Sequence, residues 1–340
     1  MKKYNKKKKL NLEICAKETW IKNNKEQRRL YSNTSQNWYE DMKRLKDGER
    51  IKLLYKYSYE GNKKLVKSLL ETAKDGFRFD EFDDDNNNVV MYAVKGGNIE
   101  TVKYLIKLGA SVNYHNNLGI TPLGLAVRKN HYVMVKAMLD VGANVNIKDG
   151  EGNTPLFDAV KENNDLLIKL LIQNGANVLI KNNVGDTILH LMAQDQSSQF
   201  IMQKLLDTNR LNVNVKNKLG KTPLYIAIEQ YKNNIVDFLL KKGADFNIAD
   251  NSGKNAIMYA AAVGNKEVLR VLIARGGNFT AVDNGNKTAL DYAKFYGHKT
   301  CVEILEKASK IYGSNLNDQE KSKKLYEFAK HNKIENSCTK

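Results

Sequence analysis

The sequence is poor in cysteine and has no long apolar run. Its three cysteines lie far apart, at Cys15, Cys301 and Cys338, and none belongs to a Cys-x-x-Cys pair. This spacing argues against a disulfide framework and a zinc site, and it favours a reducing compartment. No apolar stretch approaches the roughly 18 residues of a membrane-spanning helix, so we expect no transmembrane segment. Polar side chains interrupt the stretch 10–16 that follows the basic N-terminus, and we expect no secretory signal.

The sequence also lacks the patterns that mark catalytic sites. Its five histidines are scattered along the chain, and none has a metal-binding spacing such as His-Glu-x-x-His. It contains no nucleophile elbow, phosphate-binding loop or dinucleotide-binding fingerprint. We therefore predict a protein that is not an enzyme, with no catalytic residue, no metal and no cofactor.

What the sequence does contain is one unit repeated along most of its length. The clearest copy is residues 116–147, NNLGITPLGLAVRKNHYVMVKAMLDVGANVNI. Thr121 is a good N-cap and Pro122 suits the first position of a helix, because its missing N–H would have no partner there. Val135 and Met138 belong to the i, i+3, i+4 stripe of a second helix, which Gly142 ends in a left-handed conformation.

The copies recur at a nearly constant period. The position of Thr121 is repeated as follows: Asn88, Thr121, Thr154, Thr187, Thr222, Asn255 and Thr288. Every step is 33 residues except the fourth, which is 35. The fourth copy also lacks the Gly-Ala pair that closes several others; either it has drifted, or it marks a bend or a docking site. Two short helices cannot bury their own apolar face, so the copies are expected to stack on one another.

This unit resembles the ankyrin repeat, in which a β-turn precedes two antiparallel helices and the first helix opens with Thr-Pro-Leu-His-x-Ala. The resemblance covers residues 49–308 and implies an all-α solenoid of helix–turn–helix units with β-turn fingers. We expect about seven repeats plus an N-terminal capping unit. The histidine of the signature is present only as His190. The Thr–His hydrogen bond of this family is therefore expected in one repeat.

The sequence predicts three parts and a monomer. Residues 1–48 form a basic arm with a short docking helix at 36–46, residues 49–308 form the ankyrin-repeat solenoid, and residues 309–340 form a C-terminal capping helix and tail. A capping-box pattern at 317–320 supports the last helix.

Positive charge is concentrated at the N-terminus. The net charge is +17, and the first fifty residues carry 15 basic and 7 acidic side chains. Six lysines form the basic arm: Lys2, Lys3, Lys6, Lys7, Lys8 and Lys9. Such a run is typical of a nuclear import signal, a nucleic-acid-binding arm or an anchor to anionic lipid. A solvated tail is the alternative.

Negative charge gathers in one predicted finger, residues 77–88, with the sequence FRFDEFDDDNNN. The glycine and closing glutamate of a calcium-binding loop are absent at the required offsets. We therefore predict a solvated acidic finger rather than a metal site.

Partner contact in ankyrin repeats falls mostly on the fingertips and on the exposed side of the first helix. Carried over to this sequence, that implies a protein-binding site at Leu118, Ile120, Arg128, Lys129, Glu151, Val184, Asp186, Leu219, Lys221, Phe295 and Tyr296. Turn tips are normally polar, so the aliphatic residues among them are unusual. Exposed apolar groups rimmed by charge indicate a protein interface. The alternative is that these side chains fold onto the adjacent finger.

Together these features predict a non-enzymatic scaffold or adaptor that binds another protein on the concave face of its fingers and inner helices. The alternative is an adaptor for nucleic acid or an anionic membrane surface, acting through the basic arm. Binding through the arm would weaken steeply with salt, whereas an apolar interface would not. We expect the protein to be intracellular and cytoplasmic, with the nucleus as the alternative.

Overall fold

The computed structural model describes residues 42–75, 77–79, 81–194, 199–207, 211–314 and 317–334, with side chains to residue 328 in the last range. No strand occurs among these residues, and their helices confirm the predicted all-α fold class. No described helix is long and apolar enough to cross a bilayer. The chain divides into two compact units, Met1–Ser111 and Val112–Lys340.

The first unit contains two pairs of helices. They are α4 (Asp47–Glu60), α5 (Lys63–Glu71), α6 (Val89–Lys95) and α7 (Ile99–Lys107). Within each pair the helices pack on one another, and between pairs α4 packs on α6 and α5 on α7. The helix predicted at 36–46 lies mostly outside the described residues, of which only 42–44 are helical there.

A buried arginine ties the start of α4 to the end of α5. Arg50 is 1% exposed, and its guanidinium donates to Leu69 O at 2.6 Å, to Thr72 Oγ1 at 2.8 Å and to Met42 O at 2.6 Å. Burial lowers the pKa of Arg50, against the opposing charge of Asp47. A charged group can be buried in this way because carbonyl and hydroxyl oxygens replace its water.

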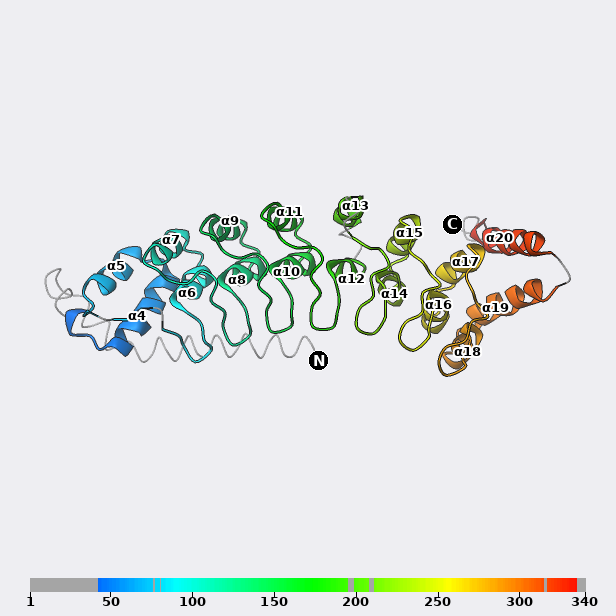
Figure 1. The fold of residues 1–340 in the computed structure, drawn as a ribbon, viewed down its shortest axis with the longest axis horizontal. Helices are drawn as coiled ribbons and strands as arrows, with labels where there is room; N and C mark the ends of the chain where they lie inside the picture. Colours follow the sequence, from blue (N-terminus) through cyan, green and yellow to red (C-terminus); the bar gives the residue numbers. More distant parts are fainter. Residues whose placement is uncertain are drawn as a thin grey trace. The chain divides into compact units, whose positions relative to one another are not determined.

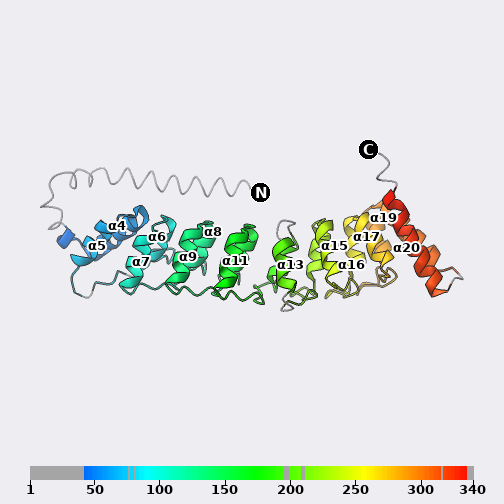
Figure 2. The ribbon, with the colours of Figure 1, turned by 90° about the horizontal axis from the view of Figure 1, so that it is seen from above.

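The second unit continues the same pairing. Its inner helices are α8 (Pro122–Arg128), α10 (Pro155–Lys161), α12 (Ile188–Met192), α14 (Pro223–Glu229), α16 (Ala256–Val263) and α18 (Ala289–Phe295). Its outer helices are α9 (Tyr132–Asp140), α11 (Asp165–Gln173), α13 (Gln199–Asp207), α15 (Asn233–Lys241), α17 (Lys266–Ala274) and α19 (Lys299–Tyr312). Within this unit the helices stand in two rows, and the fingers project beyond the inner row (Figure 1). Seen from above, each helix pair lies beside the next (Figure 2).

The helix boundaries follow from the local sequence. Thr121 Oγ1 accepts a hydrogen bond from Gly124 N at 3.1 Å, and Pro122 occupies the first turn of α8. Where the threonine is replaced, Asn88 and Asn255 serve as N-caps in the same way. Most of the predicted stripe on the outer helices is buried: Val135 and Met138 are 0% exposed, whereas Leu139 is half-buried. Within each unit, apolar residues at helical spacing thus meet between adjacent pairs and form a shared core.

Two places depart from the regular stack. The outer helix α13, in the repeat with the 35-residue step, packs more weakly on its neighbours α11 and α15 than the other outer helices of the unit do on theirs. At the other end, α19 runs past the boundary predicted at residue 308, and α20 (Asp318–Ile334) folds back onto α17 and α19.

Candidate protein-binding site

Each described finger is closed by a single side chain. The Oδ1 atom of an Asp or Asn accepts hydrogen bonds from the backbone N–H groups two and four residues later, an arrangement that fixes a tight turn. These closing residues are Asp83, Asn116, Asp149, Asn182, Asn217, Asp250 and Asp283. These residues were not predicted from the sequence, although an Asp or Asn stands five residues before each N-cap of the inner helices.

Asp83, the closing residue of the predicted acidic finger at 77–88, takes part in hydrogen bonds within the protein. Asp83 accepts hydrogen bonds from Asn87 and, at 2.7 Å, from Tyr92 Oη. Burial alone would raise the pKa of Asp83, but these hydrogen bonds outweigh it and lower the pKa. At least one carboxylate of this finger is therefore a structural acceptor rather than a freely solvated charge.

Backbone hydrogen bonds join neighbouring fingertips in the second unit. Each runs from the residue after a closing Asp or Asn to the tip carbonyl of the preceding finger: Gly150 N to Leu118 O at 2.9 Å, Asn183 N to Glu151 O at 3.0 Å, Lys218 N to Val184 O at 3.1 Å, Asn251 N to Leu219 O at 3.1 Å, and Asn284 N to Ser252 O at 2.9 Å. The tip residues Leu118, Glu151, Val184 and Leu219, which we name the fingertip row, are thereby held in register on consecutive fingers.

Glycine is required where the fingers approach so closely. Gly152 has φ +79°, and a Cβ atom there would lie 2.7 Å from the backbone nitrogen of Asn183 in the next finger. A side chain at this position would suffer both an unfavourable left-handed conformation and a backbone clash. The row is therefore a rigid edge rather than a set of independent loops.

The aliphatic side chains of the fingertip row point into solvent. Leu118 is 63% exposed, Val184 56% and Leu219 61%. The prediction that Ile120 is exposed beside them is wrong, because Ile120 is only 8% exposed. Its Cγ2 lies near Gly124 of α8, the position of the signature histidine, where a Cβ atom would be 3.6 Å away.

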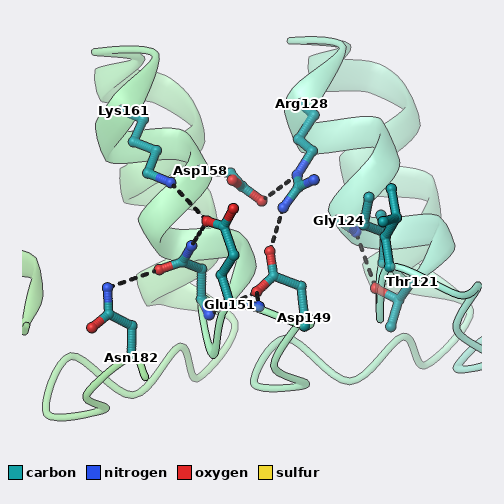
Figure 3. A network of polar contacts seen from close by, with 12 residues as sticks. Thr121, Gly124, Arg128, Asp149, Glu151, Asp158, Lys161 and Asn182 are labelled. Carbon is teal, nitrogen blue, oxygen red and sulfur yellow. Dashed lines mark hydrogen bonds and ion pairs between the residues drawn. The ribbon is translucent and has the colours of Figure 1, made fainter. Parts of the chain in front are cut away.

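Arg128, at the end of α8, connects two repeats (Figure 3). Its Nε donates to Asp158 Oδ2 at 2.8 Å, and its Nη2 pairs with Asp149, the closing residue of the next finger. Burial would lower the pKa of Arg128, but the hydrogen bonds and charges of the two carboxylates raise it. Burial raises the pKa of Asp158, although Arg128 opposes the change. This guanidinium is engaged in ion pairs within the protein, although Arg128 itself is exposed.

The other predicted site residues lie in different surroundings. Glu151 contacts Lys161 at 3.7 Å and keeps an exposed side chain (Figure 3), and Lys129 is exposed. Asp186 accepts a hydrogen bond from Asn217 Nδ2 at 2.8 Å, and Lys221 forms an ion pair with Glu229 at 2.6 Å. Asp186 and Lys221 therefore already form contacts within the protein.

The remaining predicted residues are separated from the fingertip row. Phe295 and Tyr296, at the end of α18, are 75% and 54% exposed, and their ring centroids lie 5.0 Å apart. Two further fingers separate them from Leu219. The six lysines of the basic arm lie outside the described residues.

Catalytic or metal chemistry finds no support in the described part of the chain. No group of three or more potential metal-ligating side chains occurs there. A depression of about 10 Å³ beside Arg128 has room for about one water molecule. Cys301 is 1% exposed, and burial raises the pKa of its thiol to about 11, so little thiolate forms at neutral pH.

The signature histidine makes the contact expected of it. His190 Nδ1 lies 3.0 Å from Thr187 Oγ1 and accepts from Thr187 N at 3.1 Å, which requires that Nδ1 carry no proton. Its Nε2 therefore donates to Lys221 O, 3.0 Å away in the following repeat. His190 thus links the fourth repeat to the fifth.

Comparison with known proteins identifies the class to which this architecture belongs. The family model for ankyrin repeats (3 copies) matches residues 30–116, 53–149, 109–182, 156–250 and 230–320. The chain therefore belongs to the ankyrin-repeat family. Ankyrin repeats are in general protein–protein interaction modules and typically non-enzymatic.

A solved structure is similar over much of the chain. It is the ankyrin repeat domain of Bcl-3, described as a unique member of the IkappaB protein family. The two share 26% sequence identity with a TM-score of 0.56, over 66% of this chain and 100% of that one. The comparison with curated proteins finds no match.

Proposed function

We propose that this protein is a non-enzymatic, intracellular scaffold that binds another protein along the fingertip row and the adjoining inner helices. The observation that carries the proposal is the set of three exposed aliphatic side chains, Leu118, Val184 and Leu219, held in register by the hydrogen bonds between fingertips. Turn tips without a partner are normally polar. Burying these side chains against a partner would remove apolar surface from water without ordering a loop first.

The test compares two matched double variants of the full chain. Leu118→Ser with Leu219→Ser removes the ends of the fingertip row. Val133→Ser with Leu166→Ser removes side chains of similar exposure, 58% and 64%, from the outer helices α9 and α11. Neither pair of substitutions is expected to change the melting temperature much, because a substitution at an exposed position usually changes the free energy of unfolding by under about 0.5 kcal/mol.

Proteins retained by the wild type are identified by cross-linking and mass spectrometry, and binding of the purified partner is then measured by calorimetry. We expect the fingertip variant to bind at least about tenfold more weakly, because a few side chains carry most of the binding free energy of an interface. The outer-helix variant should bind like the wild type. Equal binding by all three proteins would place the interface elsewhere, and steep salt dependence lost on deletion of residues 1–9 would assign it to the basic arm.

A further inference from the structure

A row of lysines accompanies the fingers of the last three repeats. The residue four positions after the closing Asp or Asn is lysine in these repeats, at Lys221, Lys254 and Lys287, which we name the lysine row. In the three preceding repeats the same position holds Ile120, Asn153 and Asp186. Halfway along the second unit, this position therefore changes from uncharged or acidic to basic.

Each lysine is held over an aromatic ring. Its Nζ atom lies 5.1 Å from the ring centroid of Tyr259 for Lys221, 4.8 Å from that of Tyr292 for Lys254, and 5.5 Å from that of Phe295 for Lys287. Ammonium groups are attracted to ring faces, and lysine stems cover apolar surface while the charge stays in water. The positive charges thus occupy defined places on consecutive repeats.

Two of these charges have no ion-pair partner in the described part of the chain. Lys221 is paired with Glu229, but Lys254 and Lys287 form no ion pair there. One carboxylate that interacts electrostatically with Lys254 is Asp283, which also accepts hydrogen bonds from Tyr292 Oη and from two backbone N–H groups. These hydrogen bonds, that of Tyr292 above all, lower the pKa of Asp283.

Asp291, a carboxylate that interacts electrostatically with Lys287, is likewise engaged in hydrogen bonds. Asp291 accepts hydrogen bonds from the backbone and side chain of Thr288, and these lower its pKa. Beside Lys287 lie the exposed rings of Phe295 and Tyr296. The end of the inner surface thus combines two lysines that form no ion pair within the described residues with exposed aromatic surface.

Resting on the function proposed above, we propose that the lysine row binds an acidic segment of the protein partner, rich in Asp and Glu. Carboxylates of that segment would pair with Lys254 and Lys287, and an apolar side chain would contact Phe295. Complementary charge steers and orients a partner, and it discriminates against segments that carry positive charge. Leu219 of the fingertip row and Lys221 of the lysine row lie two residues apart on one finger, and we infer that one extended chain of the partner contacts both rows.

The test uses the full chain and a fluorescein-labelled polyglutamate peptide, with binding followed by fluorescence anisotropy at low salt. Lys254→Gln with Lys287→Gln should weaken binding about fivefold to tenfold, the size expected for two exposed ion pairs. Lys254→Arg with Lys287→Arg keeps both charges and should bind like the wild type. The matched control, Lys136→Gln with Lys299→Gln, removes two exposed lysines of the outer helices and should change binding less than about twofold.

The outcomes separate this inference from the proposed function. Polyglutamate has no apolar side chain, so the fingertip variant Leu118→Ser with Leu219→Ser should bind it like the wild type even if that row is the main interface. The inference would be overturned if the control variant weakened polyglutamate binding as much as the lysine-row variant did, or if neither variant weakened it. It would also be overturned if the lysine-row glutamines weakened binding of a single-stranded oligonucleotide and left polyglutamate binding unchanged.

Discussion

Acidification should destabilise the fourth repeat through His190, the one described histidine that is fully buried. The ring is 0% exposed, and its Nδ1 accepts from Thr187 N while its Nε2 donates to Lys221 O. A proton on Nδ1 would face the N–H of Thr187 and destroy the first of these bonds. Burial accordingly lowers the pKa of His190, and the acceptor at Lys221 opposes the shift only in part.

The sign and the size of the effect follow from linkage. Because the folded state holds the pKa of His190 below the ordinary value of about 6.5, its contribution is complete above that pH and is lost as pH falls below it. If the folded ring stays neutral at pH 5.5, unfolding gains at most about 1.4 kcal/mol from protonation there. Carboxyl groups with ordinary pKa values near 4 contribute little over this interval, and the raised pKa of Asp158 acts in the opposite direction to His190.

The perturbation is His190→Phe, which places at this position the residue that Phe157 provides in the preceding repeat. Phenylalanine leaves Thr187 N and Lys221 O without this partner, at a cost of about 1–3 kcal/mol each. The variant should be less stable at pH 7.5 but should lose the pH dependence between 7.5 and 5.5. His115→Gln, at an exposed site, is the control and should keep it.

Urea unfolding at both pH values measures the difference, and ring ¹⁵N shifts report the protonation state of His190 directly. We expect the Nε2–H tautomer to persist below the ordinary pKa of histidine, because burial lowers the pKa of His190. An imidazole that titrates near pH 6.5 without loss of stability would refute the reasoning, because the two hydrogen bonds would then not depend on the neutral ring.

Three further predictions concern the fingers and the outer helices. Gly152→Ala should destabilise the protein more than Gly142→Ala, because both glycines have positive φ but of the two only Gly152 would bring a Cβ against a neighbouring backbone. The left-handed conformation alone costs about 1–2 kcal/mol in either variant. Equal shifts in melting temperature would contradict the close approach at Gly152. Asp250→Asn should keep the finger closed, as Asn217 does, and should reduce the loss of stability below about pH 4 in urea titrations. Burial would raise the pKa of Asp250, but its hydrogen bonds outweigh burial and lower the pKa. The contribution of Asp250 to stability is therefore complete above its ordinary pKa and is lost as the pH falls below it. An unchanged dependence of stability on acid pH in the variant would argue against this. Amide exchange should be faster in α13 than in the other outer helices, and equal protection of α11 and α13 would show that its weaker packing has no energetic consequence.

The sequence by itself determined the helices and their core. Thr121 and Pro122 define the start of α8, and Val135 and Met138 belong to the buried face of α9. Such features depend on residues within a few positions of one another, through capping, backbone preference and helical spacing. The recurrence of the pattern then implied that each pair of helices packs on a copy of itself, and this is the observed architecture.

Only the tertiary structure decided which side chains of the candidate site are available. Leu118 and Ile120 lie two positions apart on one finger, yet only Leu118 is exposed, while Ile120 is buried near Gly124 of α8. Arg128 meets Asp149 and Asp158, which lie 21 and 30 residues further along the chain. Contacts of this kind form between neighbouring repeats, so they depend on how the fingers and helices stack rather than on any local pattern. The period of a sequence tells which residues are equivalent, but the side chains that meet across two repeats are set by the geometry of their packing.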